Sequence, residues 1–290
     1  MILFTGLTGA VGTEIVKLLP EYGISARGLV RNVATNRGKA EALRQGGVEI
    51  VPGDLADEAA VRAALTGCEQ AFLLMANCRE QLELEKNFVD RARQCGVRHI
   101  VKMSATGAGS DSPALLKRYH GEAEEYIRQS GLACTLVRPN FFMQNLLHVA
   151  AAIVAQDQFF MPMRDGQVGA IDVRDVAHFV LSILTRPDQA QNTWEITGPE
   201  LLSFHDIAGQ LSDVMEREIS YVDVPPARFK QSLQQWVPDD WYVQTVSELF
   251  ELIAQGSGAL LNDEYTRVTG RAPTSLRQFC QDYASFFEKG

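Results

Sequence analysis

Gly6-Leu7-Thr8-Gly9-Ala10-Val11-Gly12 decides the fold of this chain, because it joins an apolar run at the start of the sequence to a helical pattern that ends near Tyr22. Gly6 permits a tight turn, Gly9 lets the backbone approach a ligand, and Gly12 lets the helix pack closely on the strand. The free N–H groups and the dipole at the start of the helix then favour a phosphate. The stretch therefore predicts a dinucleotide-binding turn, although a glycine-rich turn without a ligand has the same spacing.

Strand and helix patterns alternate from the start of the chain to residue 140. Strands are predicted at Ile2–Thr5, Ala26–Val30, Val48–Val51, Ala71–Met75, His99–Met103 and Cys134–Arg138. Helices are predicted at Val11–Tyr22, Thr35–Gly46, Glu58–Leu65 with Asp57 as its N-cap, Leu82–Cys95 and Ala114–Ser130. This alternation is typical of a parallel sheet whose strands are joined by helical crossovers.

The pattern becomes more helical and less regular after Pro139. Helices are predicted at Phe141–Ala155, Val173–Leu184, Phe204–Glu216 and Val243–Gln255, and short strands at Trp194–Thr197 and Ser220–Val224. The sequence thus predicts an α/β fold, with a Rossmann-type doubly wound parallel sheet over residues 1–140 and a smaller, mainly helical substrate region over residues 141–290. Segments between about 165 and 200 are expected to return to the Rossmann core.

Composition narrows the class of protein. The chain has 290 residues, of which 46% are hydrophobic, and a net charge of -9, which argues against nucleic acid as a partner. The five cysteines contain no C-x-x-C pair and the five histidines are scattered, so reduced thiols and no metal site are expected. With no secretory leader, and with an apolar stretch at 148–155 too short to span a bilayer, we expect a cytoplasmic protein without a membrane partner.

The end of the second predicted strand bears on the choice of cofactor. NAD-binding proteins carry an acidic residue here, about 20 residues after the glycine turn, for the ribose hydroxyls. This chain has Arg31 in that place, and Arg37 and Lys39 follow on the next helix. A guanidinium binds an adenosine 2′-phosphate well, so NADP(H) is predicted in preference to NAD(H). A solvated arginine at a strand end is the alternative.

Other strand ends supply the remaining candidate cofactor contacts. Asp54 and Leu55 follow the third strand at the adenine side, where Asp54 is almost equally well explained as a turn residue. Leu74, Met75 and Ala76 end the fourth strand and are expected near the cofactor ribose. Ser104 ends the fifth strand, where contact with the nicotinamide or the substrate and a capping role are equally good accounts.

These residues, taken together, resemble the NmrA-like atypical short-chain dehydrogenases. The resemblance covers essentially the whole chain. Within that family, the sequence most resembles the quinone oxidoreductases, triphenylmethane reductases and azoreductases. Beyond the glycine turn it is carried by Val30-Arg31, Gly53-Asp54-Leu55, the specific run Val137-Arg138-Pro139-Asn140-Phe141-Phe142-Met143-Gln144-Asn145, Asp172-Val173-Arg174-Asp175-Val176-Ala177, Glu195-Ile196-Thr197-Gly198-Pro199-Glu200 and Thr269-Gly270-Arg271-Ala272-Pro273. Asn140 departs from the glycine that usually follows the proline.

The resemblance implies NADP binding and either hydride transfer to a flat, conjugated acceptor or cofactor sensing without chemistry. Ordinary short-chain dehydrogenases use Tyr-x-x-x-Lys on the helix after the fifth strand. Aligning Ala123-Glu124 with the Ala-Glu of that motif places Leu116 at the tyrosine and His120 at the lysine. His120 is therefore a candidate for the nicotinamide ribose and for proton relay, with an unpartnered surface histidine as the alternative.

The segment after the sixth strand is the candidate acceptor site. Pro139, Phe141 and Phe142 are assigned to the nicotinamide end of the cofactor site. Phe142, Gln144 and Asn145 are assigned to the substrate. For each aromatic residue, packing in a core is the competing explanation.

Two functions follow. The first is an NADPH-dependent reductase of a quinone or similar small conjugated acceptor, with Ser104 and His120 as candidate catalytic residues. The second is a non-catalytic NADP(H)-binding redox sensor that acts through a regulatory protein partner. A homodimer is compatible with either function.

Overall fold

The computed structural model describes residues 1–35, 37–186 and 192–289. It divides the chain into two compact units. Unit 1 comprises Met1–Ser112, Arg118–Arg138 and Val173–Trp194, and unit 2 comprises Pro113–Lys117, Pro139–Asp172 and Glu195–Gly290. Residue 36, inside the helix predicted at 35–46, and residues 187–191, inside the segment predicted to return to the core, lie outside the described residues.

Seven of the described strands form one sheet, in the order β3-β2-β1-β4-β5-β6-β9. Their bounds are β1 Ile2–Phe4, β2 Ala26–Val30, β3 Glu49–Pro52, β4 Gln70–Leu73, β5 His99–Met103, β6 Ala133–Pro139 and β9 Thr193–Ile196. Neighbouring strands from β3 to β6 are parallel, with Leu3 opposite Arg27 on one side and Ala71 on the other. The predicted α/β fold with a doubly wound parallel sheet is confirmed.

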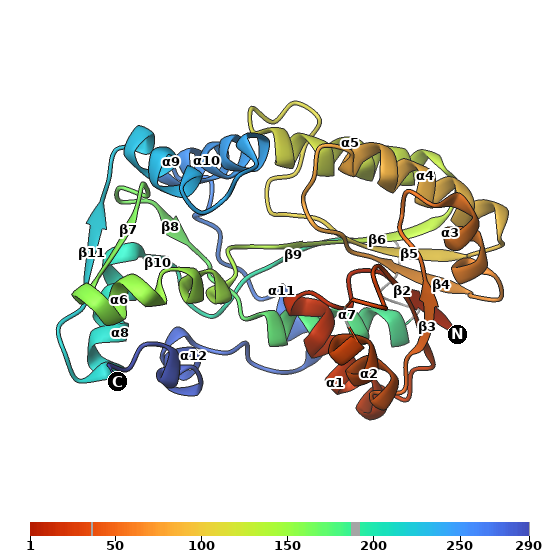
Figure 1. The fold of residues 1–290 in the computed structure, drawn as a ribbon, viewed down its shortest axis with the longest axis horizontal. Helices are drawn as coiled ribbons and strands as arrows, with labels where there is room; N and C mark the ends of the chain where they lie inside the picture. Colours follow the sequence, from red (N-terminus) through yellow and green to blue (C-terminus); the bar gives the residue numbers. More distant parts are fainter. Residues whose placement is uncertain (36, 187–191, 290) are drawn as a thin grey trace. The chain divides into compact units, whose positions relative to one another are not determined.

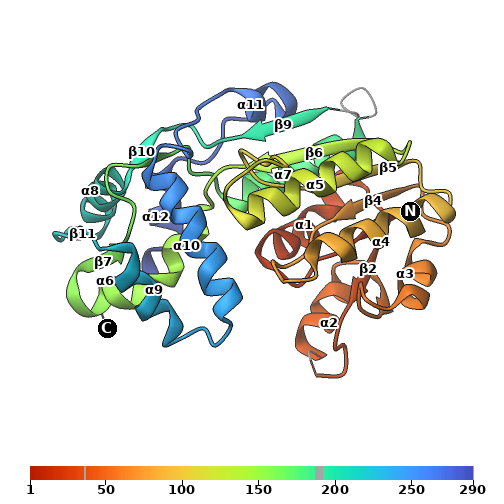
Figure 2. The same cartoon turned by 90° about the horizontal axis from the view of Figure 1, so that it is seen from above.

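Helices cover both faces of the sheet in unit 1 (Figure 1). They are α1 Ala10–Tyr22, α2 Arg37–Gln45, α3 Glu58–Leu65, α4 Gln81–Gln94, α5 Leu115–Gln129 and α7 Val173–Thr185. In Figure 1, α3, α4 and α5 lie above the strands, and α1, α2 and α7 lie below them. Figure 2 shows α4 and α5 side by side, and the Tyr126 hydroxyl of α5 donates to Asp90 Oδ1 of α4 at 3.0 Å.

The alternation of side chains along the strands produces one of these two layers. Leu3, Leu73 and Ile100 point to the same face and are fully buried. They form one apolar cluster with residues of α3, α4 and α5, including Phe88 and Ile127. The predicted N-cap of α3 is also confirmed, because Asp57 accepts from Ala59 N and Ala60 N.

The strand order reverses at β1. From β1 the chain goes to β2 and β3 on one side, then returns to β4 on the other side. Open α/β sheets bind ligands at the carboxyl ends of their strands, at such a reversal. The glycine turn directly follows β1, so it lies at this position.

Unit 2 contains two small sheets, a parallel pair β7–β11 and an antiparallel pair β8–β10. Its core holds Phe159, Phe204 and Phe279, all fully buried. Its elements are η1 Met143–His148, α6 Ala150–Gln156, β7 Gln158–Met161, β8 Gln167–Val168, β10 Leu202–Ser203, α8 Phe204–Met215, β11 Ser220–Asp223, α9 Pro226–Gln234, α10 Asp240–Ala254, α11 Glu264–Thr269, α12 Leu276–Asp282 and η3 Ala284–Phe286.

The helix predicted at Phe141–Ala155 was wrong in its first half. Phe142 and Ile171 form a parallel β-bridge, and Met143 N donates to the Ile171 carbonyl at 2.9 Å. This pairing holds the backbone extended at its start, so a 3₁₀ helix begins only at Met143 and the α-helix at Ala150. Sequence analysis also missed α9, whose first residue is Pro226.

No helix in the described part of the chain is both long enough and apolar enough to cross a lipid bilayer. The five cysteines, all of them described, are free thiols.

Candidate cofactor site

The glycine turn has the geometry that its spacing predicts. Gly6 has a φ of +71°, and a Cβ added to it would lie 2.7 Å from the Leu74 carbonyl oxygen. A Cβ on Gly12 would lie 2.3 Å from the Gly6 carbonyl oxygen. Gly6 is therefore required by its conformation and Gly12 by the approach of α1 to the turn.

The start of α1 is open to a ligand. Gly9 is the N-cap and makes no side-chain cap hydrogen bond, and no acidic residue lies in the first turn. Thr8, Gly9 and Ala10 are exposed, whereas Val11 is buried. A phosphate fits this exposed and uncapped helix start, because the N–H groups and the dipole both favour an anion.

Cationic side chains lie near the turn, on the side that the sequence predicts for the adenine. Arg31 is exposed, and its Nε lies 3.5 Å from Asp54 Oδ2. Lys39 Nζ donates to the Thr8 carbonyl at 3.3 Å, which places a second cation beside the turn. Asp54 also accepts from Ala56 N, so it serves as a turn residue, and Leu55 is half-buried.

Thr5 fastens the turn to the end of β4. Its hydroxyl donates to the Leu74 carbonyl at 2.7 Å and accepts from Leu74 N at 2.9 Å. Leu74 and Met75 are half-buried and Ala76 is exposed. The predicted ribose segment therefore follows the strand beside the glycine turn, as the sheet order requires.

Ser104 belongs to a buried ionic network. Its hydroxyl donates to Glu124 Oε1 at 2.6 Å, and Glu124 has no exposed surface. Arg138 Nε donates to the same oxygen at 2.9 Å, and Arg128 donates to Oε2 at 3.2 Å. The serine hydroxyl is thus committed as a donor, and its oxygen can only accept from a further group.

His120 lies one turn before Glu124 on α5 and contacts a second buried network. Lys102 Nζ donates to His120 Nδ1 at 3.3 Å and to Glu85 Oε1 at 2.6 Å. Burial, together with the cations Lys102 and Arg138, lowers the pKa of His120 well below its ordinary value. The imidazole is therefore neutral near pH 7.

Gly121 brings this part of α5 close to the loop that follows Ser104. A Cβ on Gly121 would lie 2.2 Å from the Gly109 carbonyl carbon. Ser104 directly follows β5, and His120 contacts Lys102 in the same strand, so both lie near β5. Their assignment to the nicotinamide end of a cofactor stays a prediction.

The predicted acceptor residues belong to unit 2. Phe141 is 9% exposed and packs edge-on against Phe204 at 5.6 Å, so core packing accounts for its side chain. Pro139 is buried, and Phe142 and Asn145 are half-buried. Gln144 Nε2 donates to the buried Asp172 Oδ1 at 2.8 Å. The assignment of these residues to a ligand stays a prediction.

Asn140 has a structural role within unit 2. Its Nδ2 donates to the Gly258 carbonyl at 3.1 Å, and its Oδ1 accepts from Phe141 N at 2.7 Å. A glycine could make neither bond. The asparagine therefore ties the segment around Gly258, which follows α10, to the backbone that begins unit 2 at Pro139.

Sequence analysis missed Gln81, Glu85, Lys102, Glu124 and Arg138. One signal was present, because Lys102 interrupts the apolar residues from Ile100 to Met103 in β5. A lysine in a buried strand requires a partner. The partner, Glu85, is 17 residues away and no local pattern points to it.

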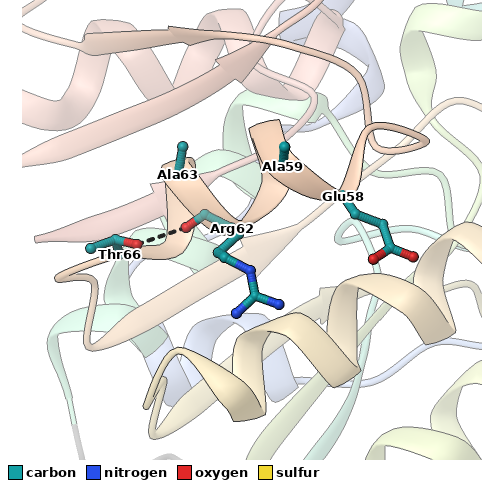
Figure 3. Close-up of a pocket in the computed structure, with 5 residues that line it drawn as sticks. All are labelled: Glu58, Ala59, Arg62, Ala63 and Thr66. Carbon is teal, nitrogen blue, oxygen red and sulfur yellow. Dashed lines mark hydrogen bonds between the residues drawn. The ribbon is translucent and has the colours of Figure 1, made fainter.

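A depression of about 480 Å³ lies on α3 of unit 1, away from the glycine turn. Figure 3 shows the residues that line it: Glu58, Ala59, Arg62, Ala63 and Thr66. Its two charged side chains are occupied, because Arg62 donates to Gln94 and Glu58 pairs with Arg91. In the described ranges no group of three or more histidine, cysteine, aspartate or glutamate residues has the geometry of a metal site.

Comparison with known proteins gives a family match over residues 1–263, to the model described as the NmrA-like family. The chain is 34% identical over 287 residues to the NAD(P)H azoreductase of Xenophilus azovorans, with 99% of each chain covered. It is 26% identical over 285 residues to quinone oxidoreductase 2 of Escherichia coli strain K12, with 96% of each chain covered.

The fold is also similar to a solved structure. The NADPH-dependent quinone oxidoreductase of Escherichia coli, crystallised in complex with NADPH, superposes with a TM-score of 0.88 at 24% identity. The match covers 97% of this chain and 99% of the other. The likeness extends over both units.

Proposed function

Because the chain belongs to the NmrA-like family, we propose that it is an NADPH-dependent reductase that transfers hydride to a quinone, an azo dye or a similar conjugated acceptor. The observation that carries the proposal is the open glycine turn at the strand reversal, together with a buried network that contacts the half-buried, neutral His120. The relatives named for azo and quinone reduction agree with this chemistry.

The cofactor is NADP(H), and the residues present fit it. The free N–H groups at the start of α1 would hold the pyrophosphate, and Arg31, with help from Lys39, would hold the 2′-phosphate. Binding the 2′-phosphate requires Arg31 to exchange its weak, exposed contact with Asp54 for a phosphate. When bound, the cofactor supplies the hydride, and the chain's residues orient it and exclude water.

The acceptor class follows from the absence of an acid at the usual place. Leu116, at the position of the usual tyrosine, is buried and cannot donate a proton. Reduction of a simple ketone needs such an acid, because charge builds up on one oxygen. A quinone or azo acceptor spreads the added electrons over its conjugated system, so positioning supplies much of the rate.

The test is NADPH oxidation by the purified protein, followed anaerobically against a panel of quinones, azo dyes and triphenylmethane dyes. NADPH and NADH binding are measured on the same sample by titration calorimetry. We expect NADPH binding in preference to NADH, and turnover with at least one acceptor class. Simple ketones and aldehydes are the control panel, and we expect no turnover with them.

Two outcomes would redirect the proposal. Tight NADPH binding without turnover on any acceptor would favour a redox sensor that acts through a protein partner. Turnover of simple ketones would show that a residue other than the one at position 116 donates the proton.

A further inference from the structure

A line of polar side chains crosses the apolar layer between the sheet and α4. Gln81 and Glu85 lie one turn apart on α4, Lys102 lies in β5, and His120 lies in α5. Gln81 and Lys102 have no exposed surface, and Glu85 is 2% exposed. Burial of a charge is costly, and the pairing of Lys102 with Glu85 offsets part of that cost.

The three N–H bonds of Lys102 each have an acceptor. Nζ lies 2.6 Å from Glu85 Oε1, 3.3 Å from the Met103 carbonyl oxygen and 3.3 Å from His120 Nδ1. An ammonium group has three donors and no acceptor. The imidazole nitrogen that faces it must therefore be the unprotonated one.

Glu85 is the ion-pair partner of Lys102 inside this apolar layer, with Oε1 2.6 Å from Nζ. Lys102 is its one ion-pair partner among the described residues, and Glu85 Oε2 accepts no hydrogen bond there. The neighbouring Gln81 Oε1 is also without a donor. Within residues 1–35, 37–186 and 192–289 no second cation pairs with this carboxylate, so Lys102 is the group that Glu85 holds in place.

The charges around His120 oppose a second proton on its ring. Lys102 of β5 and Arg138 of β6 face it as cations, and Glu85 of α4 acts on it through Lys102. A neutral imidazole has one N–H and one bare nitrogen. Since Nδ1 is the acceptor, the proton is on Nε2.

We infer that Glu85 and Lys102 are positioning residues that hold His120 as the neutral Nε2–H tautomer, so that His120 meets the bound ligand as a hydrogen-bond donor rather than as a base. The identity of the ligand rests on the proposed function. The group that receives the bond is an oxygen, from either a nicotinamide ribose hydroxyl or the carbonyl of a quinone. The half-buried ring of His120 leaves Nε2 without a protein partner in the described structure.

The direct test is ¹⁵N NMR of the histidine rings in the full chain, with and without NADPH. The His120 signals are assigned by their loss in His120→Gln. At pH 7 we expect a protonated Nε2 and an unprotonated Nδ1, unchanged on lowering the pH to 5.5. A protonated Nδ1, or a doubly protonated ring at pH 7, would overturn the inference without any further variant.

Two variants test the cause. In Glu85→Gln combined with Lys102→Met both buried charges are removed together, so neither is left unpaired. We expect the ring of His120 to become a mixture of tautomers. Lys117→Met is the matched control, because Lys117 is a buried lysine on α5 whose Nζ contacts Ser257 instead of His120. An unchanged Nε2–H tautomer in the charge-free variant would show that Lys102 does not set it.

Kinetics distinguish the two oxygens. If the ribose receives the bond, the charge-free variant raises the Kd for NADPH about tenfold and leaves the KM for the quinone unchanged. If the quinone receives it, the KM rises and the Kd does not. No change in either constant would overturn the donor role. Absence of turnover with every acceptor in the wild-type protein would count against the reductase function alone, because the tautomer and the Kd are measured without turnover.

Discussion

The two ends of the candidate cofactor site are built in opposite ways. At the end predicted for the adenine, Arg31 and Lys39 are exposed and make single, long contacts with Asp54 and with the turn. At the end predicted for the nicotinamide, Ser104 is held by the fully buried Glu124 in one short hydrogen bond. Exposed charges select a ligand by its own charge and reorganise at little cost, whereas buried networks fix geometry in advance. We therefore expect the exposed end to select the cofactor and the buried end to orient it. Five measurements test this difference between the two ends.

The largest expected effect is loss of stability at the buried end. Glu124→Gln removes the charge that Ser104, Arg128 and Arg138 share, and we expect about 3 kcal/mol less free energy of unfolding. Urea denaturation followed by circular dichroism measures it. Glu125→Gln is the matched control, because Glu125 also accepts from a serine hydroxyl, Ser110 Oγ at 2.6 Å, but is exposed. An equal loss of free energy of unfolding in both variants would contradict the difference between the buried and the exposed end.

In the glycine turn, one glycine is expected to matter for stability and another for cofactor binding. Gly12→Ala forces a Cβ against the Gly6 carbonyl oxygen, and we expect a loss of about 2 kcal/mol in the free energy of unfolding. Gly9 is extended and its Cβ would be 3.4 Å from the nearest atom, so Gly9→Ala is expected to change stability by less than about 0.5 kcal/mol. Gly9→Ala is instead expected to weaken NADPH binding. Thermal unfolding and calorimetry of both variants test this, and a destabilised Gly9→Ala protein would contradict it.

Arg31 tests whether the exposed end selects the cofactor. Arg31→Ala is expected to weaken NADPH binding by about 2 kcal/mol, the value of a charge-assisted hydrogen-bond pair, and to leave NADH binding unchanged. Titration calorimetry with both cofactors measures the difference. Arg44→Ala is the control, because Arg44 is an exposed cation of α2 that pairs with Glu41. If wild-type protein binds NADPH and NADH equally, the selective role of Arg31 is wrong.

The pH dependence of stability reports the neutral state of His120. Its pKa is held well below 6.5, and burial lowers that of His99 in the same direction. Below pH 6.5 the unfolded chain therefore binds more protons than the folded one, so the free energy of unfolding falls as the pH falls. We expect His120→Gln to recover about 1 kcal/mol of that loss at pH 5. Urea denaturation at pH 7 and 5 checks it, with exposed His148→Gln as control, and an unchanged slope would refute it.

The smallest effect is expected on α3, outside both ends. Arg62→Ala opens the depression that Figure 3 shows, and it removes one exposed hydrogen bond to Gln94. We expect less than about 0.5 kcal/mol change in stability and no change in NADPH affinity. A clear loss of cofactor affinity would mean that the depression belongs to the site.

The same division explains what could be predicted from the sequence. The glycine turn, the alternation of strands and helices, and Asp57 as an N-cap are local patterns, and the structure confirms the fold that they predict. Lys102 with Glu85 and Ser104 with Glu124 are pairs between different elements, and their partners are chosen by packing. His120 could be found by alignment, but its protonation state depends on Lys102, 18 residues earlier. The helix start predicted at Phe141 was wrong for a similar reason, because the backbone of Phe142 pairs with the distant Ile171.

The hydrogen bonds between the Thr5 hydroxyl and the Leu74 backbone have a consequence for the order of events during folding. The two residues are 69 positions apart, so the hydrogen bonds that fix the glycine turn cannot form until β1 and β4 have paired. Contacts between segments so distant in the chain form late and slowly, because the intervening loop must first be closed. In a refolding experiment, the capacity to quench or enhance NADPH fluorescence should therefore appear with the slowest phase, after most of the helical signal has been regained.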